Sequence, residues 1–272
     1  MSHEKRTLEF FVLTGFFALF VLFLYGPLSA VLILSFQGPD GGLTFPLNGV
    51  SLHWFANLFE KQAVGDFGGS FRRSFVLGLM VMVVTVVVSL LAGLAFRRKF
   101  VGATPLFYLS VASLVVPSII ISLGIGVVFQ QLGFRPAWYS SAFGAHLTWT
   151  LPFGVLIMFA VFNRFSPSYE EAARDLGATS WQTFAHVVLP MIAPSLIGVG
   201  LFGFTLSYDE FARTLMTSGT YNTLPLEIYG MTTNVTTPVL YALGTVTTLF
   251  SFLVIAATLA AIVLVNRRRL RA

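Results

Sequence analysis

The sequence contains no cysteine, and this absence excludes several kinds of site at once. Disulfide bridges, thiolate zinc centres and cysteine nucleophiles all need the missing residue. Neither a G-x-x-x-x-G-K-[ST] nucleotide loop nor a G-x-S-x-G nucleophile motif occurs. The four histidines do not have the spacing of a metal site. They are His3, His53, His146 and His186. We therefore expect no metal, nucleotide or other cofactor on this chain, and no catalysis by it.

Charged residues are also scarce, at 10% of the chain, whereas soluble domains carry about 25%. Hydrophobic residues make up 56%, and the mean hydropathy is +0.83. A soluble monomer of this composition would expose more apolar surface than such proteins tolerate. The high pI, about 9.7, does not indicate nucleic-acid binding, because the basic residues flank apolar runs instead of lining one face. The composition indicates a membrane protein.

Six apolar runs are each long enough for a membrane-spanning helix, which needs about 20 residues. They cover residues 10–36, 71–96, 105–130, 140–162, 190–212 and 239–265. Spans of a β-barrel would be shorter and would alternate apolar with polar residues. The first run is longer than the apolar core of a signal peptide, so we expect it to be retained as a span. The sequence predicts an all-α polytopic membrane protein with six transmembrane helices and a single domain, residues 1–272.

The basic residues predict how these spans are oriented. With both termini in the cytoplasm, eleven of the sixteen lysines and arginines fall in cytoplasmic segments and five in outer segments. This asymmetry is the one that the positive-inside rule expects. The adjacent Arg72 and Arg73, just before the second span, are the local exception. Residues 166–190 fall in the cytoplasm in this orientation.

Residues 166–190 form a compact polar segment between two apolar runs. The order is E-A-A, three residues, G, nine residues, an aliphatic residue, one residue, L-P. The residues that define it are Glu171, Ala172, Ala173, Gly177, Leu189 and Pro190. Gly177 can adopt the left-handed turn that ends a helix, and Ser180 is expected to cap a second short helix over residues 181–188. The alternative is an ordinary helix–turn–helix connector.

This pattern resembles the EAA loop of permease subunits of bacterial ABC importers, at every defining position. The resemblance implies the type I importer permease fold and a bacterial inner-membrane location. It also implies that residues 166–190 are the coupling segment that docks into an ATPase subunit. The implied partners are an ABC ATPase dimer carrying ATP and Mg, a second permease subunit that is a different but related chain, and a periplasmic substrate-binding protein. Membrane lipid and a small-molecule substrate complete the set, and no nucleic acid is implied.

A second group of interest is the run Tyr208, Asp209 and Glu210, near the outer end of the fifth span. Acidic groups at membrane depth are costly and usually mark a path or a partner. Alternatively, both acids lie at the water boundary, where they end the helix or pair with Arg213. Neighbouring helical residues point about 100° apart. We therefore predict that Asp209 faces the substrate path, that Glu210 packs against a neighbour or the partner subunit, and that Tyr208 offers a ring for cation–π contact.

The stretch Tyr208-Asp209-Glu210-Phe211, followed by Leu224-Pro225-Leu226-Glu227-Ile228-Tyr229, is similar to permeases of the spermidine/putrescine type. That resemblance covers nearly the whole chain and implies a polyamine or related small amine as substrate. Related permeases for opines and amino acids carry similar runs, so these substrates stay open. An ion-coupled secondary transporter is a further alternative, although we see neither the inverted repeats nor the interrupted helices that it predicts. A membrane-embedded enzyme would need a polar catalytic cluster within the spans.

Overall fold

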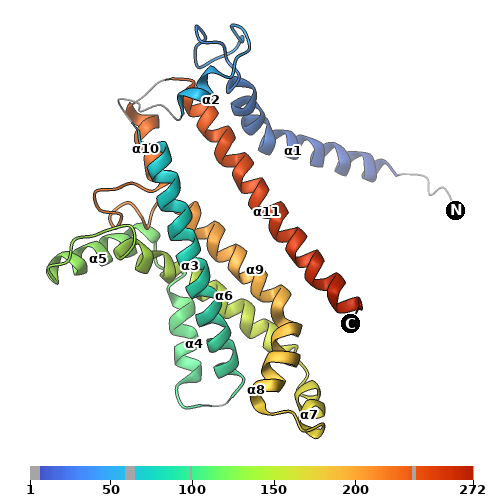
Figure 1. The fold of residues 1–272 in the computed structure, drawn as a ribbon. Helices are drawn as coiled ribbons and strands as arrows, with labels where there is room; N and C mark the ends of the chain where they lie inside the picture. Colours follow the sequence, from blue (N-terminus) through green and yellow to red (C-terminus); the bar gives the residue numbers. More distant parts are fainter. Residues whose placement is uncertain (1–6, 59–64, 99, 235–236, 272) are drawn as a thin grey trace. The chain divides into compact units, whose positions relative to one another are not determined.

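The computed structural model describes residues 7–58, 65–98, 100–234 and 237–271, which fold almost entirely into helices (Figure 1). The longer helices are α1 (Leu8–Leu34), α3 (Phe67–Phe96), α6 (Ser141–Asn163), α9 (Leu189–Tyr208) and α11 (Val239–Arg271). The shorter ones are α2 (His53–Asn57), α4 (Ala103–Ala112), α5 (Ser118–Gln131), α7 (Ser168–Asp175), α8 (Ser180–Thr183), the π-helical turn η1 (Phe184–Val188) and α10 (Leu224–Asn234). The predicted all-α polytopic class is confirmed.

The helices group into two units, residues 1–65 with 230–250 and residues 66–229 with 251–272. Among the described residues, five helical stretches are long and apolar enough to cross a membrane. They are Leu8–Leu34, Phe67–Phe96, Ser141–Asn163, Ser180–Tyr208 and Val239–Leu264. Each contains most of one predicted span. Four of the basic residues used to predict the orientation lie outside the described residues: Lys5, Arg6, Lys61 and Lys99.

The third predicted span, residues 105–130, is not one continuous helix. It is divided into α4 and α5, which run in different directions (Figure 1). Pro117 accounts for the break, because proline disfavours the helical conformation of the preceding residue and donates no backbone hydrogen bond. Beside the break, the Ser113 hydroxyl donates at 3.0 Å to the Thr148 carbonyl of α6, which Pro152 four residues later leaves without its usual N–H partner. Pro117 marks this interruption in the sequence, and our prediction of one continuous helix over residues 105–130 was wrong.

The core of the larger unit is the packing of α3, α6 and α9. Small residues let these helices approach closely, as is common between helices in membranes. A Cβ atom added to Gly154 would collide with the Ser89 hydroxyl, and one added to Gly78 would press on the ring of Phe204. Buried hydroxyls then bond across the interface, with Thr85 Oγ1 2.8 Å from Thr150 Oγ1. Apolar side chains fill the other end of the core: Met158, Phe162, Val188, Ile192, Leu196 and Val199.

Gly154→Ala is expected to destabilise the protein, because the added methyl group overlaps Ser89 on the neighbouring helix. Overpacking of this kind costs about 1–3 kcal/mol. Gly198→Ala is the matched control, since a Cβ atom there meets no other atom within 4 Å. Thermal unfolding of the two purified variants should show a lower midpoint for Gly154→Ala alone. Equal midpoints would contradict the α3–α6 packing.

The smaller unit is organised around a loop that follows α1. The buried side chain of Gln37 fixes this loop by donating to the carbonyl of Gly42 at 3.1 Å and accepting from the backbone N–H of Asn48 at 2.7 Å. The Tyr241 hydroxyl of α11 donates to the Leu43 carbonyl at 2.6 Å. These bonds join the loop to itself and to α11.

Candidate functional sites: the 166–190 segment and the acidic end of α9

The polar segment 166–190 forms the short helices α7 and α8 on either side of a glycine turn. Gly177 has a φ of 86°, in the left-handed region. Its N–H donates to the Arg174 carbonyl at 2.8 Å, and the next N–H, of Ala178, donates to the Ala173 carbonyl at 3.0 Å. This pair of bonds is the Schellman arrangement that ends many helices. The predicted role of Gly177 in ending the first helix is confirmed.

The second short helix is capped by Thr179, not by Ser180 as predicted. Gln182 N–H donates to Thr179 Oγ1 at 3.3 Å, and Thr179 N–H donates to Gln182 Oε1 at 2.8 Å. This reciprocal pair is a capping box. A Thr followed three residues later by Gln is its sequence signature, which marks the correct residue.

The apolar stretch that leads into α9 begins earlier than Leu189 and Pro190, at Ser180. Proline within a helix lacks an N–H, and its ring clashes with the carbonyl four residues earlier. The π-helical turn Phe184–Val188 stands immediately before Leu189 and Pro190. Such wider turns relieve this kind of conflict. The L-P pair therefore marks a change of helical pitch rather than a new start.

The two acids of the first turn of α7 have different surroundings. Glu170 forms a two-pronged ion pair with Arg97 at the end of α3, with N···O distances of 2.8 and 2.9 Å. This pair lowers the pKa of Glu170, through the hydrogen bonds from Arg97 above all. The guanidinium group of Arg97 also lies over the rings of Phe162 and Phe165, at 5.2 and 5.3 Å. Glu171, the acid of the motif, is exposed.

The turn around Gly177 carries large apolar side chains that the structure leaves uncovered. Leu176 is 89% exposed and Trp181 is 71% exposed. Glu171 and Ala172 are exposed as well, whereas Ala173 is half-buried. Exposed apolar groups rimmed by polar ones mark sites of protein contact. We call Glu171, Ala172, Leu176 and Trp181 the coupling surface, after the role that the sequence predicts for this segment. Its two apolar members were not predicted from the motif.

The predicted substrate-path residues lie at the far end of α9, where the helix ends at Tyr208. Tyr208 is buried, 7% exposed, with its ring stacked on Phe204 at 5.8 Å and edge-on to Phe71 at 6.3 Å. These neighbours cover the faces of the ring, so this conformation does not favour its predicted contact with a cation. Asp209 is exposed, and Glu210 is largely covered, with 11% of its side chain exposed.

Glu210 is directed towards Arg213, which is fully buried. The Arg213 N–H donates to Glu210 Oε1 at 2.9 Å, and the guanidinium lies 3.5 Å from Glu210 Oε2. The same guanidinium donates to the Ser118 hydroxyl at 2.6 Å and lies over the ring of Trp149 at 4.5 Å. Ser118 begins α5 at the helix break. Arg213 therefore joins the broken third span to α6 and to the end of α9.

His146 extends this buried polar group. Its Nδ1 lies 2.8 Å from the Ser207 hydroxyl and its Nε2 lies 2.9 Å from the Thr214 hydroxyl. Both ring nitrogens of His146 therefore take part in hydrogen bonds inside the protein. Among the described residues, no group of side chains is arranged to bind a metal ion. Of the predicted site residues, the structure brings Tyr208, Asp209 and Glu210 together at one end of α9 and the motif residues at the other.

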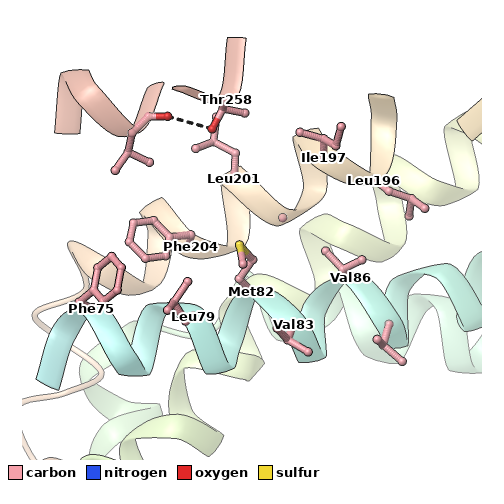
Figure 2. Close-up of a pocket in the computed structure, with 13 residues that line it drawn as sticks. Phe75, Leu79, Met82, Val83, Val86, Leu196, Ile197, Leu201, Phe204 and Thr258 are labelled. Carbon is pink, nitrogen blue, oxygen red and sulfur yellow. Dashed lines mark hydrogen bonds between the residues drawn. The ribbon is translucent and has the colours of Figure 1, made fainter. Parts of the chain in front are cut away.

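An apolar groove of about 540 Å³ also opens between α3, α9 and the second half of α11 (Figure 2). Figure 2 shows Phe75, Leu79 and Met82 facing Leu201 and Phe204 across it. The residues that line the groove are apolar apart from Thr258, whose hydroxyl bonds to its own helix at 2.9 Å. Such a lining suits an acyl chain or another helix, not the passage of a charged solute.

Residues 85–271 match the sequence profile of the family described as binding-protein-dependent transport system inner membrane component. The spermidine/putrescine transport system permease protein PotC of Escherichia coli (strain K12) is 26% identical over 90% of this chain and 91% of its own length. The putrescine transport system permease protein PotI of the same strain is 27% identical over 82% and 80%. Among solved structures, a chain of a bacterial ABC transporter involved in the import of the acidic polysaccharide alginate has a TM-score of 0.69 at 14% identity, over 96% of this chain and 95% of that one.

Proposed function

Because this chain belongs to the family of binding-protein-dependent transport system inner membrane components, we propose that it is the permease subunit of an ABC importer for polyamines. It is a multi-pass protein of the inner membrane and a transport component, not an enzyme. The substrate assignment is supported by relatives named for spermidine and putrescine over 80–90% of the chain. It is also supported by Asp209, an exposed acid at the end of a span.

The charge balance at this end of α9 is the observation that carries the proposal. Arg213 neutralises Glu210 inside the protein, which leaves Asp209 as the acid turned outwards. An ammonium group that leaves water needs a negative partner to offset its lost hydration. The exposed Asp209 carboxylate, at the mouth of the proposed path, supplies this partner. Permeases for opines and amino acids are the second candidate, because their substrates also carry an amine.

The proposed partners bind at the coupling surface and along the substrate path. An ABC ATPase dimer holding ATP and Mg docks on the coupling surface, a second and related permease subunit completes the path, and a periplasmic binding protein delivers the substrate. When the ATPase dimer closes, it moves the α7–α8 segment, and the path between the paired permease subunits opens to the outside. Coupling of this kind requires contacts that differ between the two states. The Arg97–Glu170 pair links the segment to α3, so its motion is passed to a membrane-spanning helix.

The proposal is tested by isolating the intact complex. The tagged chain, purified from its own membranes, is expected to carry an ABC ATPase and a related permease. The binding protein recovered with them is expected to hold a polyamine. A binding protein that holds an opine or an amino acid selects the second candidate. Isolation of the chain with no ATPase would contradict the proposed function as a whole.

The proposed orientation predicts which surface residues react from outside the cell. Single cysteines introduced at Asp40, Phe134 and Thr220 should react with an impermeant thiol reagent, and those at Val101 and Thr179 should not. All five positions are exposed, and the native chain supplies no background thiol. Val101 and Phe134 are preferable to their neighbours Gly102 and Gly133. The φ values of these glycines, 93° and 75°, disfavour a side chain. Labelling of the cysteine at position 179 from outside the cell would contradict the proposed orientation.

A further inference from the structure

A polar cleft of about 550 Å³ lies between the end of α3 and the 166–190 segment, apart from the coupling surface and the acidic end of α9. Its walls combine basic, hydroxyl and apolar side chains: Leu94, Ala95, Arg97, Arg98, Glu170, Arg174, Ser180, Thr183 and Phe184. Three arginines face a single acid there. Glu170 is ion-paired with Arg97 and also interacts electrostatically with Arg174, so three positive charges against one negative charge leave the cleft with a net charge of +2. Within the described residues, neither the Arg98 nor the Arg174 side chain forms an ion pair or a hydrogen bond.

A buried hydroxyl on the same wall is also without a partner. Thr183 is only 3% exposed, and its Oγ1 has no hydrogen bond. Helical threonines commonly satisfy this atom at a carbonyl of the preceding turn. A buried polar group without a partner costs about 1–3 kcal/mol. Two unpaired guanidinium groups and one unpaired donor therefore converge on one cleft, and together they fit an anion with several acceptor oxygens.

The position of the cleft indicates where the anion comes from. Leu94 and Ala95 belong to the last turns of one membrane-spanning helix, and Phe184 belongs to another apolar stretch that is long enough to span, Ser180–Tyr208. The loop beyond Arg98 carries Phe100, 40% exposed, and the fully exposed Val101. Apolar side chains beside basic ones are typical of a segment that lies against the bilayer surface.

We propose that this cleft binds the phosphate of an anionic phospholipid. Arg98 and Arg174 contact the phosphate oxygens, and the Thr183 hydroxyl donates to one of them. Leu94, Ala95 and Phe184 meet the glycerol and the first methylenes of the lipid. The bound lipid then bridges α3 and the coupling segment, beside the Arg97–Glu170 pair. The leaflet concerned depends on the orientation given under the proposed function, whereas the binding itself does not.

The test measures binding of phosphatidylglycerol to the full chain in detergent, with phosphatidylcholine as the comparison lipid. Arg98→Gln and Arg174→Gln are each expected to weaken phosphatidylglycerol binding about fivefold, the contribution of one basic residue near a membrane surface. Arg164→Gln is the matched control, since Arg164 is an exposed arginine outside the cleft. Equal weakening by Arg164→Gln would show a diffuse attraction and overturn the site.

The hydroxyl provides a second test that a general loss of charge does not imitate. Thr183→Val should weaken phosphatidylglycerol binding several-fold, and Thr183→Ser should restore it. The midpoint of thermal unfolding without lipid should rise or stay the same in Thr183→Val, because the change removes a buried hydroxyl that has no partner to lose. Unaltered lipid binding by Thr183→Val would contradict the assignment.

Two further arms identify the source of the anion. Millimolar inorganic phosphate should not displace phosphatidylglycerol, and its doing so would replace the lipid with a soluble anion. Addition of the ATPase subunit should leave the lipid bound. Release of the lipid on assembly would show that the cleft is not a lipid site in the assembled complex, and would overturn the lipid proposal. Because no arm measures transport, this proposal and the proposed function fail separately.

Discussion

Gly177→Val is expected to abolish transport while the protein still inserts in the membrane. Gly177 adopts a φ of 86°, which a β-branched side chain scarcely tolerates. The valine would break the paired hydrogen bonds that end α7 and would shift Leu176 and Trp181, the exposed apolar part of the coupling surface. ATP-driven uptake and copurification of the ATPase should both fall to background.

Glycine can be needed at this turn for its left-handed conformation or for a close approach of the ATPase, and Gly177→Asn distinguishes these two reasons. Asparagine tolerates the left-handed conformation, and a Cβ atom added at this position meets nothing within 4 Å beyond its chain neighbours. If only the turn matters, Gly177→Asn should dock and transport nearly as well as the parent. If the ATPase approaches the glycine closely, Gly177→Asn should fail as Gly177→Val does. Normal transport by Gly177→Val would remove the coupling role from this segment.

Asp209→Asn is expected to lower polyamine uptake by about tenfold or more, the effect of losing one hydrogen bond to a charged group. Assembly and basal ATP hydrolysis should be preserved, because Asp209 is exposed and lies at the end of α9. Initial uptake rates by the assembled transporter, measured over a range of polyamine concentrations, separate a change in apparent affinity from a change in maximal rate.

The control for the charge itself is Asp40→Asn, since Asp40 is an exposed acid in the loop after α1. Glu210→Gln is a poor control, because Glu210 compensates the buried Arg213. Removal of one member of a buried pair destabilises proteins by about 3–5 kcal/mol. Uptake by the Asp209→Asn, Glu210→Gln double variant equal to that of the parent would eliminate the acidic passage and the main residue-level argument for a cationic substrate.

The sequence predicts the parts of this fold that depend on local properties. Span positions follow from the length of apolar runs, and the end of α7 follows from one glycine, because both are set within a few residues of the chain. The break between α4 and α5 also has a local cause in Pro117. The length of the apolar run does not reveal it, because a single proline changes the hydropathy of the run very little. The capping box of Thr179 and Gln182 is local as well, and was assigned one residue away.

The parts that the sequence does not reveal depend on contacts between distant segments. Arg213 was counted with the outer-loop charges that set the orientation, whereas it is buried against Trp149 and Ser118. Arg73, part of the local exception to the positive-inside rule, is paired with Asp66 at 3.2 Å. In both cases the acid is a near neighbour in the sequence, seven residues from Arg73 and three from Arg213, and a pair with Arg213 was one of the two alternatives for the acids of α9. The remaining partners come from distant segments: the Asn222 carbonyl accepts from Arg73 at 2.6 Å, and Trp149 and Ser118 contact Arg213. No pattern near either arginine indicates these distant partners.

Uptake of labelled spermidine into proteoliposomes is the most direct test of the central claim, that this chain is the permease of a polyamine importer. The complex isolated through this chain is reconstituted with its binding protein, with ATP on the side of the ATPase. The account predicts spermidine accumulation that requires both ATP and the binding protein, together with little uptake of a neutral solute of similar size. Spermidine uptake without ATP, or ATP-driven uptake that excludes polyamines, would contradict it.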